Sequence, residues 1–273
     1  MTADFTPDEM MTIAAARMLT SQDVCFVGIG PPSAACNMAR LTHAPGITLI
    51  YESGTIGTAP NVLPLSIGDG ELCDTALTTV SVPEMFRYWL QGGHITVGFL
   101  GAAQIDRFGN INTTVIGDYA SPRTRLPGGG GAPEIASLSQ KVFVTMKQSH
   151  RAMVDNIDFV TSFGHGQGAG DRAAKGLTTA GPAALITDLA VWEPDPDTGE
   201  LTVTTLHAGT SRAAVAESCG WPARFASGLV ESPPPTTEEL SVLRALKERT
   251  EKAHARTVDP APAADDGIAS PVR

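Results

Sequence analysis

Short apolar runs alternate with helix-like segments along most of the chain. Seven runs have the length and the β-branched content of buried strands. They lie at 24–27, 47–51, 95–100, 141–146, 158–162, 184–188 and 201–206. Helices are predicted at 6–19, 34–41 and 83–91, and Thr6, Pro7 and Glu9 form a capping-box pattern at the start of the first. Strands that alternate with helices predict an α/β fold, an open and mainly parallel sheet with flanking helices.

The composition changes at Ser232-Pro233-Pro234-Pro235, where we expect the compact body to end. The pattern predicts one domain over 1–232 and a C-terminal capping helix within 233–256, after this proline-rich linker. Leu240, Leu243 and Leu246 fall on one face of that helix. The remaining residues, 257–273, contain too few apolar side chains to fold, so we expect a disordered tail.

The charge balance excludes several classes of partner. The chain has 19 basic and 29 acidic residues and a formal net charge of −10, which argues against nucleic-acid binding and against an anionic membrane surface. The N-terminal segment is acidic and no long apolar run follows, so we expect a cytoplasmic protein without a membrane span. Cys25, Cys36, Cys73 and Cys219 are widely spaced, which favours buried free thiols in a reducing compartment.

Glu52 ends an apolar strand and is followed at once by Ser53-Gly54. Parallel α/β sheets place their chemistry outside the carboxyl ends of the strands, where this carboxylate would lie. A carboxylate there can act as a nucleophile toward an activated acyl group. It can equally cap a helix or bind a backbone amide, so the residue alone leaves both interpretations open.

Two common cofactor motifs are not matched. Gly28-Ile29-Gly30 follows a predicted strand, but Pro31 and Pro32 remove amide donors that a pyrophosphate would need, and the third glycine is absent. This argues against a nicotinamide or flavin site. The histidines lack metal-ligand spacing, so no metal site is expected.

Two glycine-containing segments could form part of a ligand pocket. The run Gly128-Gly129-Gly130-Gly131 before Ala132 lets backbone amides approach an oxyanion or a phosphate, although it could also be a flexible surface hairpin. In the second segment, residues 101–112, the part from Asp106 to Asn110 has the composition of a tight turn. The small residues before it, from Gly101 to Gln104, suit the wall of a close-fitting pocket.

These segments occur in one order together with Gly92-Gly93-His94, Ser66-Ile67-Gly68-Asp69 and Asp155-Asn156-Ile157-Asp158. As a set they resemble the β subunits of family I coenzyme A transferases, in particular the branch of glutaconate and 3-oxoadipate CoA-transferases. The resemblance covers roughly residues 5–232. It implies the architecture of that family, which is similar to the NagB/RpiA fold.

The resemblance also implies a mechanism. Glu52 would be the catalytic nucleophile that forms a covalent glutamyl-CoA thioester, and no bound cofactor or metal would be needed, because a coenzyme A thioester is itself a substrate. The expected oxyanion and CoA-binding residues are Gly128, Gly129, Gly130, Gly131 and Ala132. The expected substrate-pocket residues are Gly101, Ala102, Gln104 and Asn112.

The expected partners are an acyl-CoA, a carboxylic acid and a homologous α subunit, in an α2β2 or larger assembly. The acid, dicarboxylic or a 3-oxo acid, is left open by the sequence. One alternative is an acyl-CoA thioester or ring-opening hydrolase on the same scaffold, although the presence of Glu52 favours transfer. A second is a ligand-sensing regulator, which would need a basic DNA-binding segment that the sequence lacks.

Overall fold

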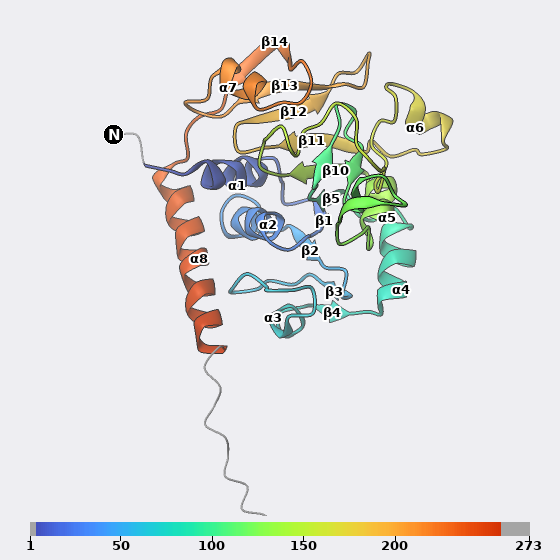
Figure 1. Cartoon of the computed structure of the whole chain (residues 1–273). Coiled ribbons are helices and arrows are strands. Elements are labelled where there is room, and N and C mark those ends of the chain that lie inside the picture. The colour runs from blue at the N-terminus through green and yellow to red at the C-terminus, as the bar shows by residue number, and fades with distance from the viewer. Residues whose placement is uncertain (1–3, 258–273) are drawn as a thin grey trace, which may run out of the picture.

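The computed structural model describes residues 4–257 and contains a ten-stranded sheet between two layers of helices (Figure 1). The strand order is β14-β13-β12-β11-β10-β5-β1-β2-β3-β4. The central strands, from β11 to β2, all run parallel. They are β1 (Val24–Phe26), β2 (Thr48–Ile50), β5 (Val97–Leu100), β10 (Lys141–Thr145) and β11 (Pro182–Ile186).

The outer strands add antiparallel pairs at both edges. Beyond β2 lie β3 (Thr55–Ile56) and β4 (Thr78–Thr79), each antiparallel to its neighbour. Beyond β11 lie β12 (Ala190–Pro194), β13 (Leu201–Leu206) and β14 (Arg224–Glu231). Strand β12 is antiparallel to both of its neighbours, and β13 and β14 are parallel. The sheet is therefore open and mixed, with a parallel centre.

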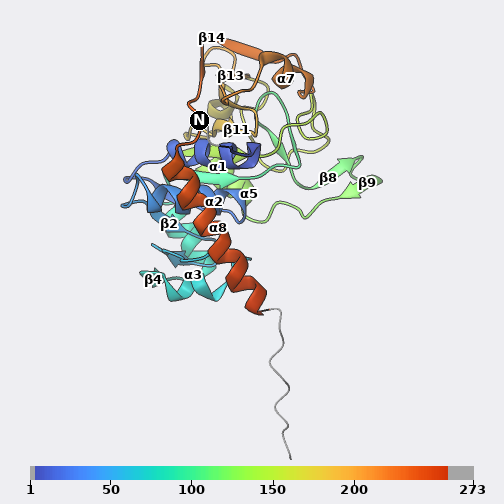
Figure 2. The same ribbon diagram turned by 90° about the vertical axis from the view of Figure 1, so that its left-hand side faces the viewer.

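Helices cover both faces of the sheet (Figure 1). One face carries α1 (Pro7–Arg17), α2 (Pro31–Leu41) and α8 (Thr237–Thr257), and the other carries α5 (Ala132–Leu138) and α4 (Val82–Glu84), which continues into the π-helix η1 (Met85–Leu90). The shorter helices are α3 (Gly70–Asp74), α6 (Asp171–Ala174) and α7 (Arg212–Glu217). Two hairpins, β6–β7 (Gln104–Ile105 and Ile111–Asn112) and β8–β9 (Val115–Gly117 and Pro122–Arg125), lie outside the main sheet. Figure 2 shows the β8–β9 hairpin extending away from the body.

The two faces of the sheet form two separate hydrophobic cores. Successive strand residues alternate between them, because side chains along a strand point to opposite faces. Cys25 and Leu49 pack under α1 and α2, whereas Phe26 and Ile50 pack on the side of α5 and η1. Burial on both faces holds the central strands, and with them the positions of their carboxyl ends.

Most of the predicted elements are present, and the capping box of α1 is confirmed. The Thr6 hydroxyl accepts from the Glu9 amide at 3.2 Å, and the Glu9 carboxylate accepts from the Thr6 amide at 2.9 Å. The segment predicted as a helix at 83–91 is helical, but most of it has π-helical hydrogen bonding. The exposure of Cys73 corrects the expectation of four buried thiols; the other cysteines are buried.

The strand predicted at 158–162 is wrong. Phe159 stacks on Tyr119 of the β8–β9 connection with ring centroids 5.3 Å apart, and Val160 is half exposed. Only Ser162 forms a β-bridge, with Ile111 of the β6–β7 hairpin. Phe159 therefore packs against a hairpin, and the segment does not pair with the main sheet.

The C-terminal helix packs on the body through two ion pairs. Arg17 bonds to Glu239 at 2.7 Å, and Arg244 bonds to Glu9 at 2.7 Å. The tail predicted for 257–273 lies, apart from Thr257, outside the described residues. Within residues 4–257, no helix combines the length and the apolar character needed to cross a membrane.

Candidate active site

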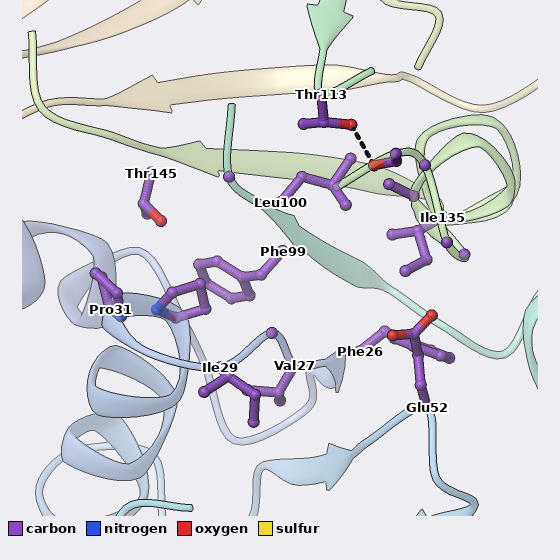
Figure 3. A pocket seen from close by; sticks show the side chains of 18 residues that line it. Phe26, Val27, Ile29, Pro31, Glu52, Phe99, Leu100, Thr113, Ile135 and Thr145 are labelled. Carbon is purple, nitrogen blue, oxygen red and sulfur yellow. Dashed lines mark hydrogen bonds between the residues drawn. The ribbon is translucent and has the colours of Figure 1, made fainter. Parts of the chain in front are cut away.

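The carboxyl ends of four parallel strands enclose a cavity of about 320 Å³ (Figure 3). The chain passes from β1 to β2 on one side and later returns to β5 on the other side of β1, so the direction of winding reverses between β1 and β5. Ligands of open α/β sheets bind at such a reversal. The cavity is lined by Phe26, Val27, Gly28, Ile29, Pro31, Pro32, Glu52, Phe99, Leu100, Gly101, Thr113, Gly128, Gly129, Gly130, Gly131, Ala132, Ile135 and Thr145.

Glu52 lies in the tight turn that joins β2 to β3. The Gly54 amide donates to the Tyr51 carbonyl at 3.0 Å, and the Tyr51 amide donates to the Thr55 carbonyl at 3.2 Å. Gly54 has φ +100°, and a Cβ there would overlap the Val80 carbonyl. The turn therefore requires a glycine at position 54, and it directs the Glu52 carboxylate out of the sheet.

The residue before Glu52 is anchored inside the protein. Tyr51 is fully buried, and its hydroxyl lies 2.7 Å from the Ser33 hydroxyl on α2. Asn37 donates to the Ser33 carbonyl at 2.9 Å. Burial raises the pKa of the Tyr51 phenol, so this side chain stays neutral and keeps its hydrogen bond over the physiological range. The network fixes the backbone from which the Glu52 side chain projects.

The glycine run forms a loop over Glu52 that leads into α5. Gly128 is held at both backbone groups, because its amide donates to the Thr113 carbonyl and its carbonyl accepts from the Thr113 hydroxyl, each at 2.8 Å (Figure 3). A Cβ at Gly131 would overlap Oε1 of Glu52 and would lie 2.5 Å from Cζ of Phe86. Because Gly131 has no side chain, the Glu52 carboxylate can occupy this position.

Burial raises the pKa of the Glu52 carboxyl above its usual range, and a hydrogen bond from the Gly131 amide opposes that shift. In Figure 3 the carboxylate points from the turn toward Ile135, and Phe26 lies beside it. The Phe26 ring meets the Phe86 ring edge-on, with centroids 5.7 Å apart. An aromatic wall thus removes water from one side of the carboxylate while a backbone amide binds it.

A second cavity, of about 470 Å³, also ends at Glu52. It shares Gly130 and Gly131 with the first cavity, and its other lining residues come from α4, η1, Gln91 and α5. They include Arg87 and Glu134, whereas Glu52 is the only charged residue within the range 4–257 that lines the first cavity. The carboxylate therefore lies where an apolar cavity and a charged cavity meet.

The structure brings together most of the predicted site residues. Glu52, Gly101 and the segment Gly128–Ala132 line one cavity. Ala102 does not line it and packs against the core on the α5 side. The interpretation of the glycine run as a flexible surface hairpin does not hold, because the loop is fastened to Thr113 and continues into α5.

Gln104 and Asn112, predicted as pocket residues, do not line this cavity, and Gln104 lines a separate cavity of about 530 Å³. Both lie in the β6–β7 hairpin, where Asn112 donates to the Gln104 side chain at 2.7 Å and to the Val115 carbonyl at 2.6 Å. The Gln104 amide in turn donates to Asp158 at 3.1 Å. Their polar groups satisfy each other and hold the hairpin, because the strand register places the two residues directly opposite each other.

Sequence reasoning missed other lining residues. In the sequence, Gly28 and its neighbours suggest only a dinucleotide motif, yet residues 26–29 form one wall of the cavity. Thr145 ends β10, is 6% exposed, and its hydroxyl has no hydrogen-bond partner among the described residues. The end of a predicted strand was a usable signal for Thr145, whereas nothing in the sequence pointed to Arg87. In residues 4–257, no group of three or more His, Cys, Asp or Glu side chains could hold a metal ion.

Comparisons with known proteins identify the family of this chain. Residues 8–218 match the family model described as coenzyme A transferase. The chain is 59% identical over 250 residues to the β subunit of the 3-oxoadipate CoA-transferase of Pseudomonas knackmussii, covering 92% of this chain and 96% of that one. It is 31% identical over 243 residues to the β subunit of the glutaconate CoA-transferase of Acidaminococcus fermentans, covering 87% and 91%.

The fold matches a solved structure. The crystal structure of glutaconate coenzyme A-transferase from Acidaminococcus fermentans superposes with a TM-score of 0.83 at 30% identity, covering 89% of this chain and 95% of that chain. The α/β architecture with an open, mostly parallel sheet and flanking helices, expected from the sequence, is therefore confirmed.

Proposed function

The chain belongs to the coenzyme A transferase family, and we propose that it is the β subunit of a heteromeric enzyme that moves coenzyme A from an acyl-CoA to 3-oxoadipate. The observation that carries the chemistry is the position of Glu52, half-buried at the carboxyl edge of the sheet and bonded to the Gly131 amide. The acceptor is inferred from the relative that is 59% identical over nearly its whole length.

In the proposed mechanism, the Glu52 carboxylate attacks the thioester carbonyl of the acyl-CoA. The carbon–sulfur bond breaks, which gives a mixed anhydride and a CoA thiolate. The thiolate then attacks the glutamyl carbonyl, so that Glu52 becomes a CoA thioester and the first acid leaves as its carboxylate. The acceptor acid then reacts with the glutamyl-CoA thioester through the same two steps in reverse order and leaves as the new acyl-CoA. No water or redox partner enters, and the mechanism needs no resident cofactor.

A carboxylate is a weak nucleophile, so the rate must come from positioning and from stabilisation of the developing oxyanion. Tyr51 and the turn at Gly54 fix the nucleophile, and burial beside Phe26 weakens its hydration. Gly129, Gly130 and Gly131 line the cavity beside Glu52, and their backbone amides are the proposed oxyanion donors. One such donor contributes about 3 to 4 kcal/mol to the transition state.

The site also explains a need for a partner. Both cavities beside Glu52 lie at the surface of this chain, whereas a thioester intermediate has to be shielded from water. We propose that a homologous α subunit covers them, in an α2β2 or larger assembly. The two relatives compared above are each one subunit of a CoA-transferase with more than one kind of chain, as their names state.

The test is a transfer assay on this chain co-expressed with its α subunit. Acetyl-, butyryl- and succinyl-CoA are offered as donors and 3-oxoadipate as acceptor, and new acyl-CoA is measured. We expect ping-pong kinetics and no transfer by Glu52→Gln. Consumption of many equivalents of acyl-CoA per enzyme without an acceptor acid, or transfer retained by Glu52→Gln, would contradict the proposal.

A further inference from the structure

Glu52 is shared by two cavities of different chemistry. The cavity at the strand ends is bounded by Phe99, Leu100 and Ile135, and apart from Glu52 it is lined by no charged side chain. The cavity along η1 is lined by Arg87 and Glu134. A double displacement at Glu52 needs space for an acid and for a thiol arm around one carboxyl group, and two cavities provide it.

We propose that each of the two cavities binds one of the two substrates. The cavity along η1 takes the acid, with Arg87 bound to its non-reacting carboxylate, and the cavity at the strand ends takes the thiol arm of coenzyme A, with Thr145 bound to an amide of that arm. The inference rests on the proposed function, whose acceptor is a dicarboxylic acid, and adds to it two specificity-determining residues, Arg87 and Thr145.

Arg87 is suited to bind a carboxylate. It is exposed and forms no ion pair with any residue in the range 4–257. A guanidinium can bind a carboxylate through two parallel hydrogen bonds. The π-helical turn of η1 places Arg87 on the wall that also contains Phe86, the residue in contact with the Gly131 position. Among the described residues, it is the only cation lining either cavity at Glu52.

Glu134 lines the same cavity and opposes anion binding there. When the acceptor acid arrives, however, Glu52 has become a neutral thioester, so Arg87 and Glu134 balance each other. The acid then meets one fewer negative charge than it would in the free enzyme. The distal carboxylate of a dicarboxylic acid therefore meets less repulsion in the second half-reaction than it would in the free enzyme.

Thr145 is suited to the other substrate. Its hydroxyl is buried without a partner among residues 4–257, although buried hydroxyl groups are nearly always hydrogen-bonded. Figure 3 shows this side chain across the cavity from Glu52, beyond Phe99. The thiol arm of coenzyme A is uncharged and carries amides, so it fits an apolar cavity with an unpaired hydroxyl. A second carboxylate in that cavity would find no cation among its lining residues.

The test compares two variants of the complex with its α subunit. Arg87→Met is assayed with adipate and hexanoate, which differ only in the distal carboxylate; hexanoate is measured as an inhibitor where it does not turn over. We expect the preference for adipate to fall by about 10- to 100-fold, as for loss of a hydrogen bond to a charged group, with partial recovery in Arg87→Lys. Glu134→Gln should increase that preference.

Thr145→Val keeps the shape of the side chain and removes only the hydroxyl. It should lower kcat/KM for butyryl-CoA by about 2- to 10-fold and leave the preference for adipate unchanged. Arg212→Met, an exposed arginine on α7 near the opposite edge of the sheet, is the control for loss of a surface charge. It should change neither quantity.

The assignment would be overturned if Arg87→Met left the preference for adipate unchanged, which includes the case in which it weakens adipate and hexanoate equally. A lowered preference for adipate in Thr145→Val would also overturn it. These outcomes are distinct from failure of the proposed function, in which the wild-type complex would transfer coenzyme A to no acid at all.

Discussion

The carboxylate of Glu52 occupies the space that a side chain at Gly131 would need. A Cβ on Gly131 would overlap Oε1 of Glu52 and would also press on the Phe86 ring. The two residues are 79 positions apart in the numbering of the chain. They meet because Glu52 lies just after the end of β2 and Gly131 lies just before the start of α5. The glycine loop and the proposed nucleophile are therefore matched in shape.

Gly131→Ala should displace the carboxylate and reduce kcat by about 100-fold or more, because a misplacement of about 1 Å has an effect of that size. The fold should persist, since the strain is confined to the cavity. Steady-state kinetics and a thermal melt measure the two effects. Gly70→Ala is the matched control, because a Cβ there meets no atom within 4 Å. Equal activity of both variants would show that the contact at Gly131 does not position Glu52.

The pH dependence of the first half-reaction should report the raised pKa of Glu52. The nucleophile is the ionised form, so kcat/KM for the acyl-CoA should fall as the pH is lowered through the pKa of this carboxyl. Since burial raises that pKa, the acidic limb should lie above 4.5, the ordinary value for a glutamate. A limb at or below 4.5 would contradict the environment described for Glu52.

The same shift has a consequence for stability. A carboxyl whose pKa is higher in the folded state stabilises the fold only below its unfolded pKa, and that contribution is lost as the pH rises through the folded pKa. The ionised Glu52 is thus unfavourable at neutral pH. Glu52→Gln, which keeps an acceptor for the Gly131 amide, should melt at a higher temperature than wild type at about pH 7. The difference between the two melting temperatures should shrink near about pH 4. A lower melting temperature for Glu52→Gln than for wild type at neutral pH would contradict this prediction.

Arg172 should be essential for the stability of the segment below the glycine loop. It is buried, and its guanidinium donates to the carbonyls of Ala136 in α5, of Phe163 and of Gly164, and to both oxygens of Thr179. Arg172→Met should leave these acceptors unpaired and lower the free energy of unfolding by about 2 to 4 kcal/mol in urea titrations. The exposed Arg212→Met loses only the contact of its guanidinium with the Phe225 ring and should stay within about 1 kcal/mol of wild type. Similar effects of both variants would refute this role.

The central strands could be predicted from sequence because each is an apolar run buried on both faces. The segment at 158–162 also contains apolar residues, but Phe159 packs against a hairpin and Val160 is half exposed, and no local pattern encodes this tertiary arrangement. Strands β12 and β14 were not predicted. In β14 the exposed residues outnumber the buried ones, so it lacks the apolar signal of a core strand.

The site was predictable to the extent that its residues follow strands. Glu52 follows β2 by two positions, Gly101 comes directly after β5, and the glycine run is recognisable by itself. Gln104 and Asn112 have the right chemistry, yet the hairpin register turns them toward each other. Arg87 depends on the π-helical turn of η1, whose hydrogen bonding is not visible in the sequence.

The covalent role of Glu52 can be tested most directly by the mass of this chain. The complex with the α subunit is incubated with an acyl-CoA without acceptor acid, denatured in acid, and analysed intact and after borohydride reduction and digestion. We predict a mass increase of one coenzyme A on the wild-type chain, conversion of Glu52 to the corresponding alcohol on reduction, and neither change in Glu52→Gln. A wild-type chain without a CoA adduct under every acyl-CoA, or an adduct that persists in Glu52→Gln, would contradict a covalent role for this residue.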